Sequence, residues 1–280
     1  MTFPGAGESA KPDAAALAGL AESVAREAAD LLLAAHDEAA VVHVKSSPTD
    51  VVTQLDQAAE QLIRDRLLAA RPADAILGEE GGQTGHGEVR WIVDPLDGTV
   101  NYLYGLPDWA VSIAAEVDGE VVAGVVCVPL QRTVFTATLG GGAFLESAGR
   151  DGRQRLACNS GVSLSQALVA TGFGYAAARR ASQGQVAAGV LPRVRDIRRA
   201  GSAATDLCSV AAGRVDAYYE QGVHEWDIAA GGLIAREAGA MMGGLNGQAA
   251  GEAMTIAAAP TLFRELHDLL VTLDADRLPA

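Results

Sequence analysis

Apolar residues recur along the chain with two different periods, which predict helices and strands in turn. Between Pro12 and His36 they return at helical spacing, as in an amphipathic helix with one face in the core. A second helix is expected from Thr53, because Thr53 and Asp56 form a Thr-x-x-Asp start signal, and Pro72 ends its apolar pattern. The N-terminal part of the chain therefore predicts two helices.

Shorter apolar runs follow and predict a meander of strands. The pair Asp118-Gly119 is typical of a tight hairpin between the two longest runs. Glycines at 140–142 and at 149 and 152 interrupt the pattern and predict two halves, 1–150 and 151–280, within one compact unit. The expected strands cover 75–77, 90–93, 110–117, 121–128 and 133–138.

Beyond residue 150, strands and helices take turns. This alternation predicts a layered α/β architecture. Strands are expected at 167–171, 194–197 and 215–220, and helices at 181–191, from Ser202, at 226–238 and at 261–273.

Composition narrows the class of protein. The chain has 280 residues, 49% of them hydrophobic, which suffices for a large core. It contains no apolar run of about 18 residues and no basic leader, so we expect a cytoplasmic protein without a membrane partner. A net charge of -14 argues against nucleic acid as a partner. The three scattered cysteines indicate buried, inert thiols.

Candidate chemistry begins where the apolar run 91–93 ends. Asp94 would leave the strand tip, Asp97 would return beside it around a turn, and Gly98 would let a ligand approach the backbone. An acidic, solvated turn is the alternative interpretation of this stretch alone. Glu79 follows the neighbouring apolar run, so adjacent strand ends would bring its carboxylate close. Asp227 opens a later helix, where it either caps the helix or joins the cluster.

A cluster of carboxylates in one pocket would be costly without bound cations. Glu79, Asp94, Asp97 and Asp227 therefore predict a site for hard divalent metals, provided that their segments converge. The five histidines show no metal-binding pair on a helix, and we expect them to be structural or exposed. Four arginines in 193–199 are expected to form a solvated or interface face.

The acidic positions lie in three stretches: Gly78-Glu79-Glu80, residues 94–101 (Asp-Pro-Leu-Asp-Gly-Thr-Val-Asn) and residues 226–231 (Trp-Asp-Ile-Ala-Ala-Gly). Together these stretches resemble the magnesium-dependent inositol monophosphatase family. Further stretches lie nearer to inositol monophosphatase itself: 45–53, 201–204 and 216–220. The resemblance implies a layered αβαβα sandwich of the inositol monophosphatase and fructose-1,6-bisphosphatase type.

The resemblance also implies roughly two to three Mg²⁺ ions in the site. Glu79, Asp94 and the Leu96 carbonyl look like ligands of a first ion. Asp94, Asp97 and Asp227 look like ligands of a second, and Glu79 would contact a third, weaker one. Inhibition by lithium is implied by resemblance as well.

Roles in catalysis and substrate binding follow from the same resemblance. Thr99 and Asp56 look like the pair that orients the attacking water and accepts its proton, with Glu79 assisting. Gly98 and Thr99 would offer backbone N–H groups to the phosphate. The implied contacts to substrate hydroxyls are Asp97, Gly201, Ser202, Ala203, Glu220 and Asp227.

The implied reaction is hydrolysis of myo-inositol monophosphate by in-line attack of a metal-activated water, in a homodimer. Histidinol phosphate, fructose 1,6-bisphosphate and adenosine 3',5'-bisphosphate are alternative substrates. A non-catalytic sugar-phosphate-binding homologue is a further alternative. An aspartyl-phosphate phosphatase is disfavoured, because the loop reads Asp-x-x-Asp rather than Asp-x-Asp, and no phosphate-binding Gly-x-x-x-x-Gly-Lys motif occurs.

Overall fold

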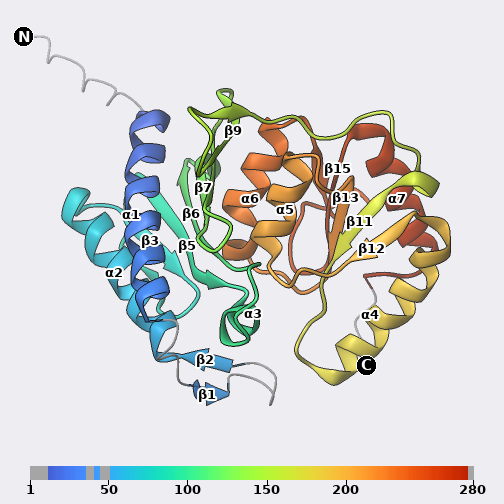
Figure 1. Ribbon diagram of the computed structural model, residues 1–280, viewed down its shortest axis with the longest axis horizontal. Helices are drawn as coiled ribbons and strands as arrows, with labels where there is room; N and C mark the ends of the chain where they lie inside the picture. Colours follow the sequence, from blue (N-terminus) through green and yellow to red (C-terminus); the bar gives the residue numbers. More distant parts are fainter. Residues whose placement is uncertain (1–11, 36–40, 45–50, 277–280) are drawn as a thin grey trace, which may run out of the picture.

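Helices and sheets alternate across the molecule as an αβαβα stack. The computed structural model describes residues 12–35, 41–44 and 51–276. In Figure 1, the outer helices α1 (Ala14–Ala34) and α2 (Gln54–Ala70) lie on the left of the first sheet. Helices α5 (Ala203–Ala211) and α6 (Glu225–Glu237) separate the two sheets, and α4 (Ala177–Val190) and α7 (Pro260–Thr272) cover the far side of the second. The predicted layered fold is confirmed.

Within the described residues, the first sheet has eight strands, and β3 and β5 form its one parallel pair. The strands of this sheet extend past residue 150, as far as Arg155. The division of the chain into halves at residue 150 stays a prediction. In spatial order the strands are β10 (Gln154–Arg155), β9 (Gly142–Ser147), β8 (Thr133–Thr138), β7 (Glu120–Val128), β6 (Ala110–Val117), β5 (Val89–Asp97), β3 (Ala75–Gly78) and β4 (Gly82–Thr84).

In the described part of the chain, the second sheet has five strands. Strand β11 pairs in parallel with both of its neighbours, and β15 pairs antiparallel with β13 and β14. A separate antiparallel pair joins β1 (Val41–Val44) and β2 (Val51–Thr53). The order in the second sheet is β12 (Asp196–Arg198), β11 (Leu168–Thr171), β13 (Ala217–Glu220), β15 (Thr255–Ala258) and β14 (Met241–Gly243).

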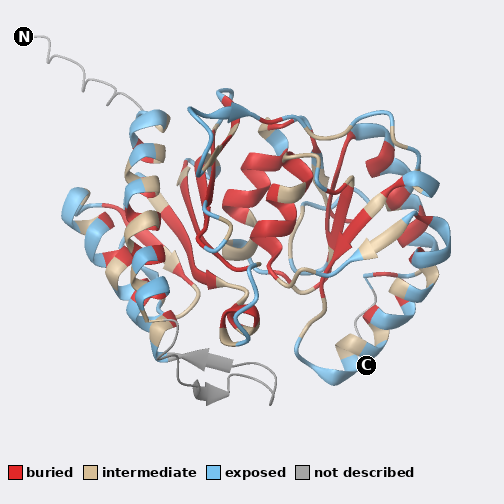
Figure 2. Cartoon of the chain, in the orientation of Figure 1, coloured by how far each residue is buried: buried red, intermediate tan, exposed pale blue. Residues whose placement is uncertain are grey.

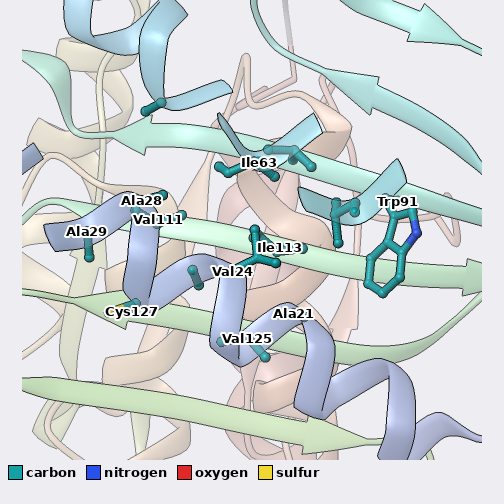
Figure 3. Packing of buried hydrophobic residues seen from close by; sticks show 14 of the residues in the cluster. Ala21, Val24, Ala28, Ala29, Ile63, Trp91, Val111, Ile113, Val125 and Cys127 are labelled. Atoms are coloured by element: carbon teal, nitrogen blue, oxygen red, sulfur yellow. The ribbon is translucent and has the colours of Figure 1, made fainter. Parts of the chain in front are cut away.

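Each boundary between layers holds its own apolar cluster. Successive residues of a strand face opposite sides, so Trp91 packs toward α1 and α2 while Ile92 packs toward α5 and α6. Figure 3 shows Ala21, Val24 and Ala28 of α1 near Ile113 in the sheet. Because both faces of the sheet are covered, most residues of its central strands are buried (Figure 2).

The expected elements lie within a few residues of those observed, with informative exceptions. Strand β5 runs to Asp97 instead of ending at Val93, so Asp94 lies within the strand and not beyond its tip. Helix α4 begins at Ala177, before the expected start at 181. The short strands β4, β9, β10, β14 and β15 were not predicted. None of the described helices is long and apolar enough to cross a membrane.

Candidate active site

Parallel pairing of β3 and β5 brings the first two carboxylates to one edge of the sheet. Gly78 lies opposite Val93, so Glu79 and Asp94 follow at the same level. The Glu79 N–H donates to the Val93 carbonyl at 3.2 Å, which ties the end of β3 to β5. The expected convergence of these two residues is confirmed by the strand register.

The backbone after Asp94 is held by the Asp94 side chain itself. The Leu96 N–H donates to Asp94 Oδ1 at 3.0 Å, while the pairing of β5 with β6 is irregular between Asp94 and Asp97. Gly98 then adopts φ 95°, and a Cβ there would lie 2.9 Å from the Asp108 carbonyl oxygen. Only glycine fits that backbone without strain. This turn leads directly into the short helix α3 (Thr99–Leu103).

Thr99 connects the turn to helix α2. Its hydroxyl donates to the Leu96 carbonyl at 3.2 Å and lies 3.5 Å from Asp56 Oδ2. Asp56 is buried on α2 and does not line the pocket, so it reaches the site through Thr99. The structure thus brings together the hydroxyl and the carboxylate that the sequence pairs.

Asp97 is held by the start of helix α5. Its Oδ2 accepts hydrogen bonds from the Ser202 hydroxyl at 2.7 Å and from the Ala204 N–H at 2.6 Å. Burial raises the pKa of Asp97 to about 6, and the Ser202 and Ala204 hydrogen bonds oppose that rise. Because Asp97 ends β5 and Ser202 caps the start of α5, this contact joins the two halves of the chain across the site.

Asp227 lies in the first turn of α6 and both caps the helix and lines the pocket. Its Oδ2 accepts from the His224 N–H at 2.6 Å, as in a capping box. Burial and the neighbouring charge of Asp97 raise its pKa well above the usual range. The two interpretations of Asp227 that the sequence left open are therefore compatible.

These segments enclose a pocket of about 480 Å³ that is rich in carboxylates. Burial raises the pKa of Asp94 well above its usual value, and the charges of Glu79 and Asp97 raise it further. All predicted site residues line the pocket except Asp56: Glu79, Asp94, Leu96, Asp97, Gly98, Thr99, Gly201, Ser202, Ala203, Glu220 and Asp227.

The donor set fits a hard divalent cation. The carboxylate and carbonyl oxygens are the ligand types that Mg²⁺ prefers, and a cation would offset their mutual repulsion. Within the described ranges, no three His, Cys, Asp or Glu side chains are grouped closely enough to hold an ion by themselves. Mg²⁺ usually keeps several waters and combines one or two carboxylates with a substrate phosphate, so an open arrangement is compatible with its binding.

Glu220 lies at the end of β13, on the side of the pocket away from β5. Its Oε2 accepts from the Tyr218 hydroxyl at 2.9 Å, and burial raises its pKa to about 7. The carboxylate packs against Gly172, where even a Cβ would collide with it. Gln183 of α4 accepts from the Gly174 N–H and donates to the Gln221 carbonyl, both at 2.9 Å. The loops on either side of Glu220 are therefore tied together.

Three further pocket residues were missed or only partly anticipated. Arg199 lines the pocket, although the arginine run was expected to be a solvated or interface face. His224 lines it as well, beside Asp227, and so does Tyr175, which is 39% exposed. Arg199 precedes Gly201, a predicted substrate contact, by two residues. That proximity in the sequence is the signal that would have predicted Arg199 in the pocket. The motif residues at 45–50 lie outside the described residues.

Asp206, on α5 behind Glu220, leads to a pH-dependent prediction. Its Oδ2 has no hydrogen-bond partner in the described part of the chain, and burial, with the charge of Glu220, raises its pKa to about 8. The folded protein then keeps a proton that the unfolded chain loses near pH 4, so this residue lowers stability as pH rises from about 4 through about 8. Asp206→Asn should therefore raise the Tm by several degrees near pH 8 and by little near pH 4. Thermal unfolding at several pH values tests this, with exposed Asp65→Asn as the control. A pH-independent difference in Tm would contradict it.

Residues 13–274 match the sequence model of a protein family that is described as the inositol monophosphatase family. The chain belongs to this family. The resemblance inferred from the three sequence stretches is thereby confirmed. Members of the inositol monophosphatase family are phosphatases that generally depend on divalent metals.

Relatives within the inositol monophosphatase family carry different names. The chain is 48% identical over 269 residues to inositol-1-monophosphatase SuhB of Mycobacterium tuberculosis, covering 90% of this chain and 92% of that protein. It is 41% identical over 217 residues to Nus factor SuhB of Xylella fastidiosa, covering 77% of each chain. The solved structure of Mycobacterium tuberculosis SuhB matches with a TM-score of 0.80 at 45% identity, covering 95% of this chain and 99% of that one.

Proposed function

We propose that this family member is a Mg²⁺-dependent phosphomonoesterase that hydrolyses myo-inositol monophosphate to myo-inositol and phosphate. The observation that carries the proposal is the gathering of Glu79, Asp94 and Asp227 around one pocket, beside the Thr99 hydroxyl. The 48% identity to a protein named inositol-1-monophosphatase favours inositol over the other phosphate esters.

The proposed metal ligands are carboxylates on both sides of the pocket, together with the Leu96 carbonyl. Glu79 and Asp94 would hold one ion with that carbonyl. Asp94, Asp97 and Asp227 would contribute to another, whose coordination waters and the substrate phosphate would complete. Roughly two or three bound Mg²⁺ ions would offset the charge of these carboxylates and of the phosphate dianion, and would favour deprotonation of the attacking water.

Thr99 and Asp56 form the proposed pair that handles the proton. Thr99 lines the pocket while the Asp56 carboxylate lies behind it. With its hydrogen turned from the Leu96 carbonyl toward Asp56, the Thr99 hydroxyl would accept a hydrogen bond from the water. As the water attacks, its proton would pass to Thr99 and the Thr99 proton would pass to the Asp56 carboxylate. Glu79, across the turn, is proposed to assist as a second acceptor. Attack by water itself leaves no need for a covalent phosphoenzyme.

The remaining residues are proposed to bind the substrate. The N–H groups of Gly98 and Thr99 would donate to the phosphate. Hydroxyls of a polyol would donate to Glu220 and Asp97, which both line the pocket. Gly201, Ser202 and Ala203 form the pocket wall at the start of α5. Assembly as a homodimer and location in the cytoplasm stay predictions.

Phosphate release from a panel of esters tests the substrate. With saturating Mg²⁺, we expect the highest kcat/KM for myo-inositol 1-phosphate, above histidinol phosphate, fructose 1,6-bisphosphate and adenosine 3',5'-bisphosphate. A higher kcat/KM for one of these three would replace inositol as the substrate. Binding of all four without release of phosphate would instead indicate a non-catalytic sugar-phosphate-binding protein.

A further inference from the structure

Helix α2 buries a row of charged side chains as well as its apolar face. Asp56, Glu60 and Arg64 follow one another at four-residue spacing, which places them along one side of the helix. All three are buried, with Glu60 only 2% exposed. Buried charges are retained only where partners satisfy them, so the contacts of this row indicate what it holds.

Glu60 holds the backbone that follows Glu79. Its Oε2 accepts from the Glu80 N–H at 2.7 Å, and its Oε1 accepts from the Gly81 N–H at 2.8 Å. Arg64 Nε donates to the same Oε1 at 2.7 Å. One buried carboxylate therefore ties the two residues after Glu79 to helix α2.

Arg64 extends the contact along the same segment. Its two terminal nitrogens donate to the Thr84 hydroxyl at 2.9 Å and to the Gly82 carbonyl at 2.6 Å. The β3–β4 turn is thus bonded at successive positions to two side chains of one helix. Asp56 lies one turn before Glu60 on α2, with its carboxylate beside the Thr99 hydroxyl. The row of charged side chains therefore contacts Thr99 as well as the segment that follows Glu79.

Two glycines leave the space that the Glu60 carboxylate needs. A Cβ at Gly81 would lie 2.8 Å from Glu60 Oε1, and a Cβ at Gly78 would collide with the same carboxylate. These glycines flank Glu79 and Glu80 in the stretch Gly78-Glu79-Glu80-Gly81. The local sequence around Glu79 is therefore fitted to a carboxylate that comes from another element.

We propose that Glu60, supported by Arg64, is a positioning residue that fixes Glu79 for binding a divalent metal. This inference rests on the proposed function, because it takes Glu79 as a metal ligand. Glu79 lies between two anchors: its own N–H is bonded to Val93, and the next two N–H groups are bonded to Glu60. Groups that orient a metal ligand typically contribute about tenfold to a hundredfold in metal affinity or activity.

Binding of Mn²⁺ in the absence of substrate, measured by titration calorimetry, tests this role without relying on activity. Glu60→Gln keeps the shape of the side chain but replaces one acceptor oxygen by an amide NH2 group, which would face an N–H donor that needs an acceptor. We expect its Mn²⁺ affinity to fall by about tenfold to a hundredfold. The Mg²⁺ concentration for half-maximal activity should rise in step, while KM measured at saturating Mg²⁺ stays near the parent value.

Two further variants separate positioning from stability. Glu27→Gln removes an exposed ion pair between Glu27 of α1 and Arg66 of α2. This control variant should bind Mn²⁺ like the parent. The double variant Glu60→Gln with Arg64→Met removes the buried charge that Glu60→Gln alone leaves without its partner, so its Tm should recover. Its Mn²⁺ affinity should stay low, because the N–H groups after Glu79 still lack their carboxylate.

Parent-like Mn²⁺ affinity in Glu60→Gln, or recovery of affinity in the double variant, would overturn the positioning role while leaving the proposed function intact. Absence of Mn²⁺ binding to the parent would overturn both proposals. A parent that binds Mn²⁺ but hydrolyses no phosphate ester would overturn the proposed function alone.

Discussion

Replacing Asp94 by Asn is expected to abolish Mg²⁺-dependent phosphate release and, at the same time, to stabilise the metal-free protein. Asp94 is proposed as a ligand of both principal ions, so its loss should remove several kcal/mol of transition-state stabilisation. That corresponds to about a thousandfold or more in kcat/KM. Asn retains an oxygen that can accept from the Leu96 N–H, so the local backbone should persist.

The gain in stability follows from charge. Burial and the carboxylates of Glu79 and Asp97 raise the pKa of Asp94. Ionisation of Asp94 therefore opposes folding once the pH rises above the pKa of an ordinary aspartate. Asn removes this cost, and the Tm at pH 7 should rise in the presence of a chelator. Added Mg²⁺ should then stabilise the parent more than the variant.

Activity assays and thermal unfolding with and without Mg²⁺ measure both effects. The exposed Asp65 on α2 supplies a matched control, because Asp65→Asn makes the same chemical change away from the pocket. A folded Asp94→Asn protein that keeps more than about a tenth of the parent kcat/KM would contradict the role of Asp94 as a shared ligand.

Replacing Thr99 by Val should lower kcat by about 10²- to 10⁴-fold, the range typical of a lost group in proton transfer. Val has nearly the shape of Thr but cannot donate to the Leu96 carbonyl or interact with Asp56 through a hydroxyl. The metal ligands are unchanged, so the Mg²⁺ concentration for half-maximal activity should remain near the parent value.

Thr99→Ser is the conservative variant that tests the hydroxyl itself. It keeps the oxygen and should retain kcat within about tenfold of the parent. Steady-state kinetics over a range of Mg²⁺ concentrations distinguish the two variants. Equal losses in Val and Ser would show that packing of the Thr99 methyl group, and not its hydroxyl, governs the reaction.

The sequence could predict the layers because apolar periodicity is strongest in long, buried elements. The helix between Pro12 and His36 and the strand at 110–117 are such cases, and both lie close to their expected bounds. Strand β15, Thr255–Ala258, is short and buried on both faces, so it shows no alternation that would separate it from a loop. Strand pairing supplies the information that its local pattern lacks.

The residues of the candidate site likewise fall into those that the sequence could predict and those that it could not. Glu79, Asp94 and Asp227 were predictable as candidates, because the first two follow recognisable apolar runs and the third opens a helix. Glu60 and Arg64 were not, since an oppositely charged pair four residues apart on a helix usually indicates a solvated face. Only the packing of α2 against the β3–β4 turn shows that this pair is buried and bonded to the backbone after Glu79.

The central claim is that the carboxylate pocket uses Mg²⁺ to hydrolyse a phosphate monoester. The most direct measurement is phosphate release from myo-inositol 1-phosphate by metal-stripped protein as Mg²⁺ is added back. The account predicts no release in chelator, release that rises to saturation with Mg²⁺, and no such rise in Asp94→Asn. Release that is insensitive to chelator, or that Mg²⁺ restores equally in Asp94→Asn, would contradict it.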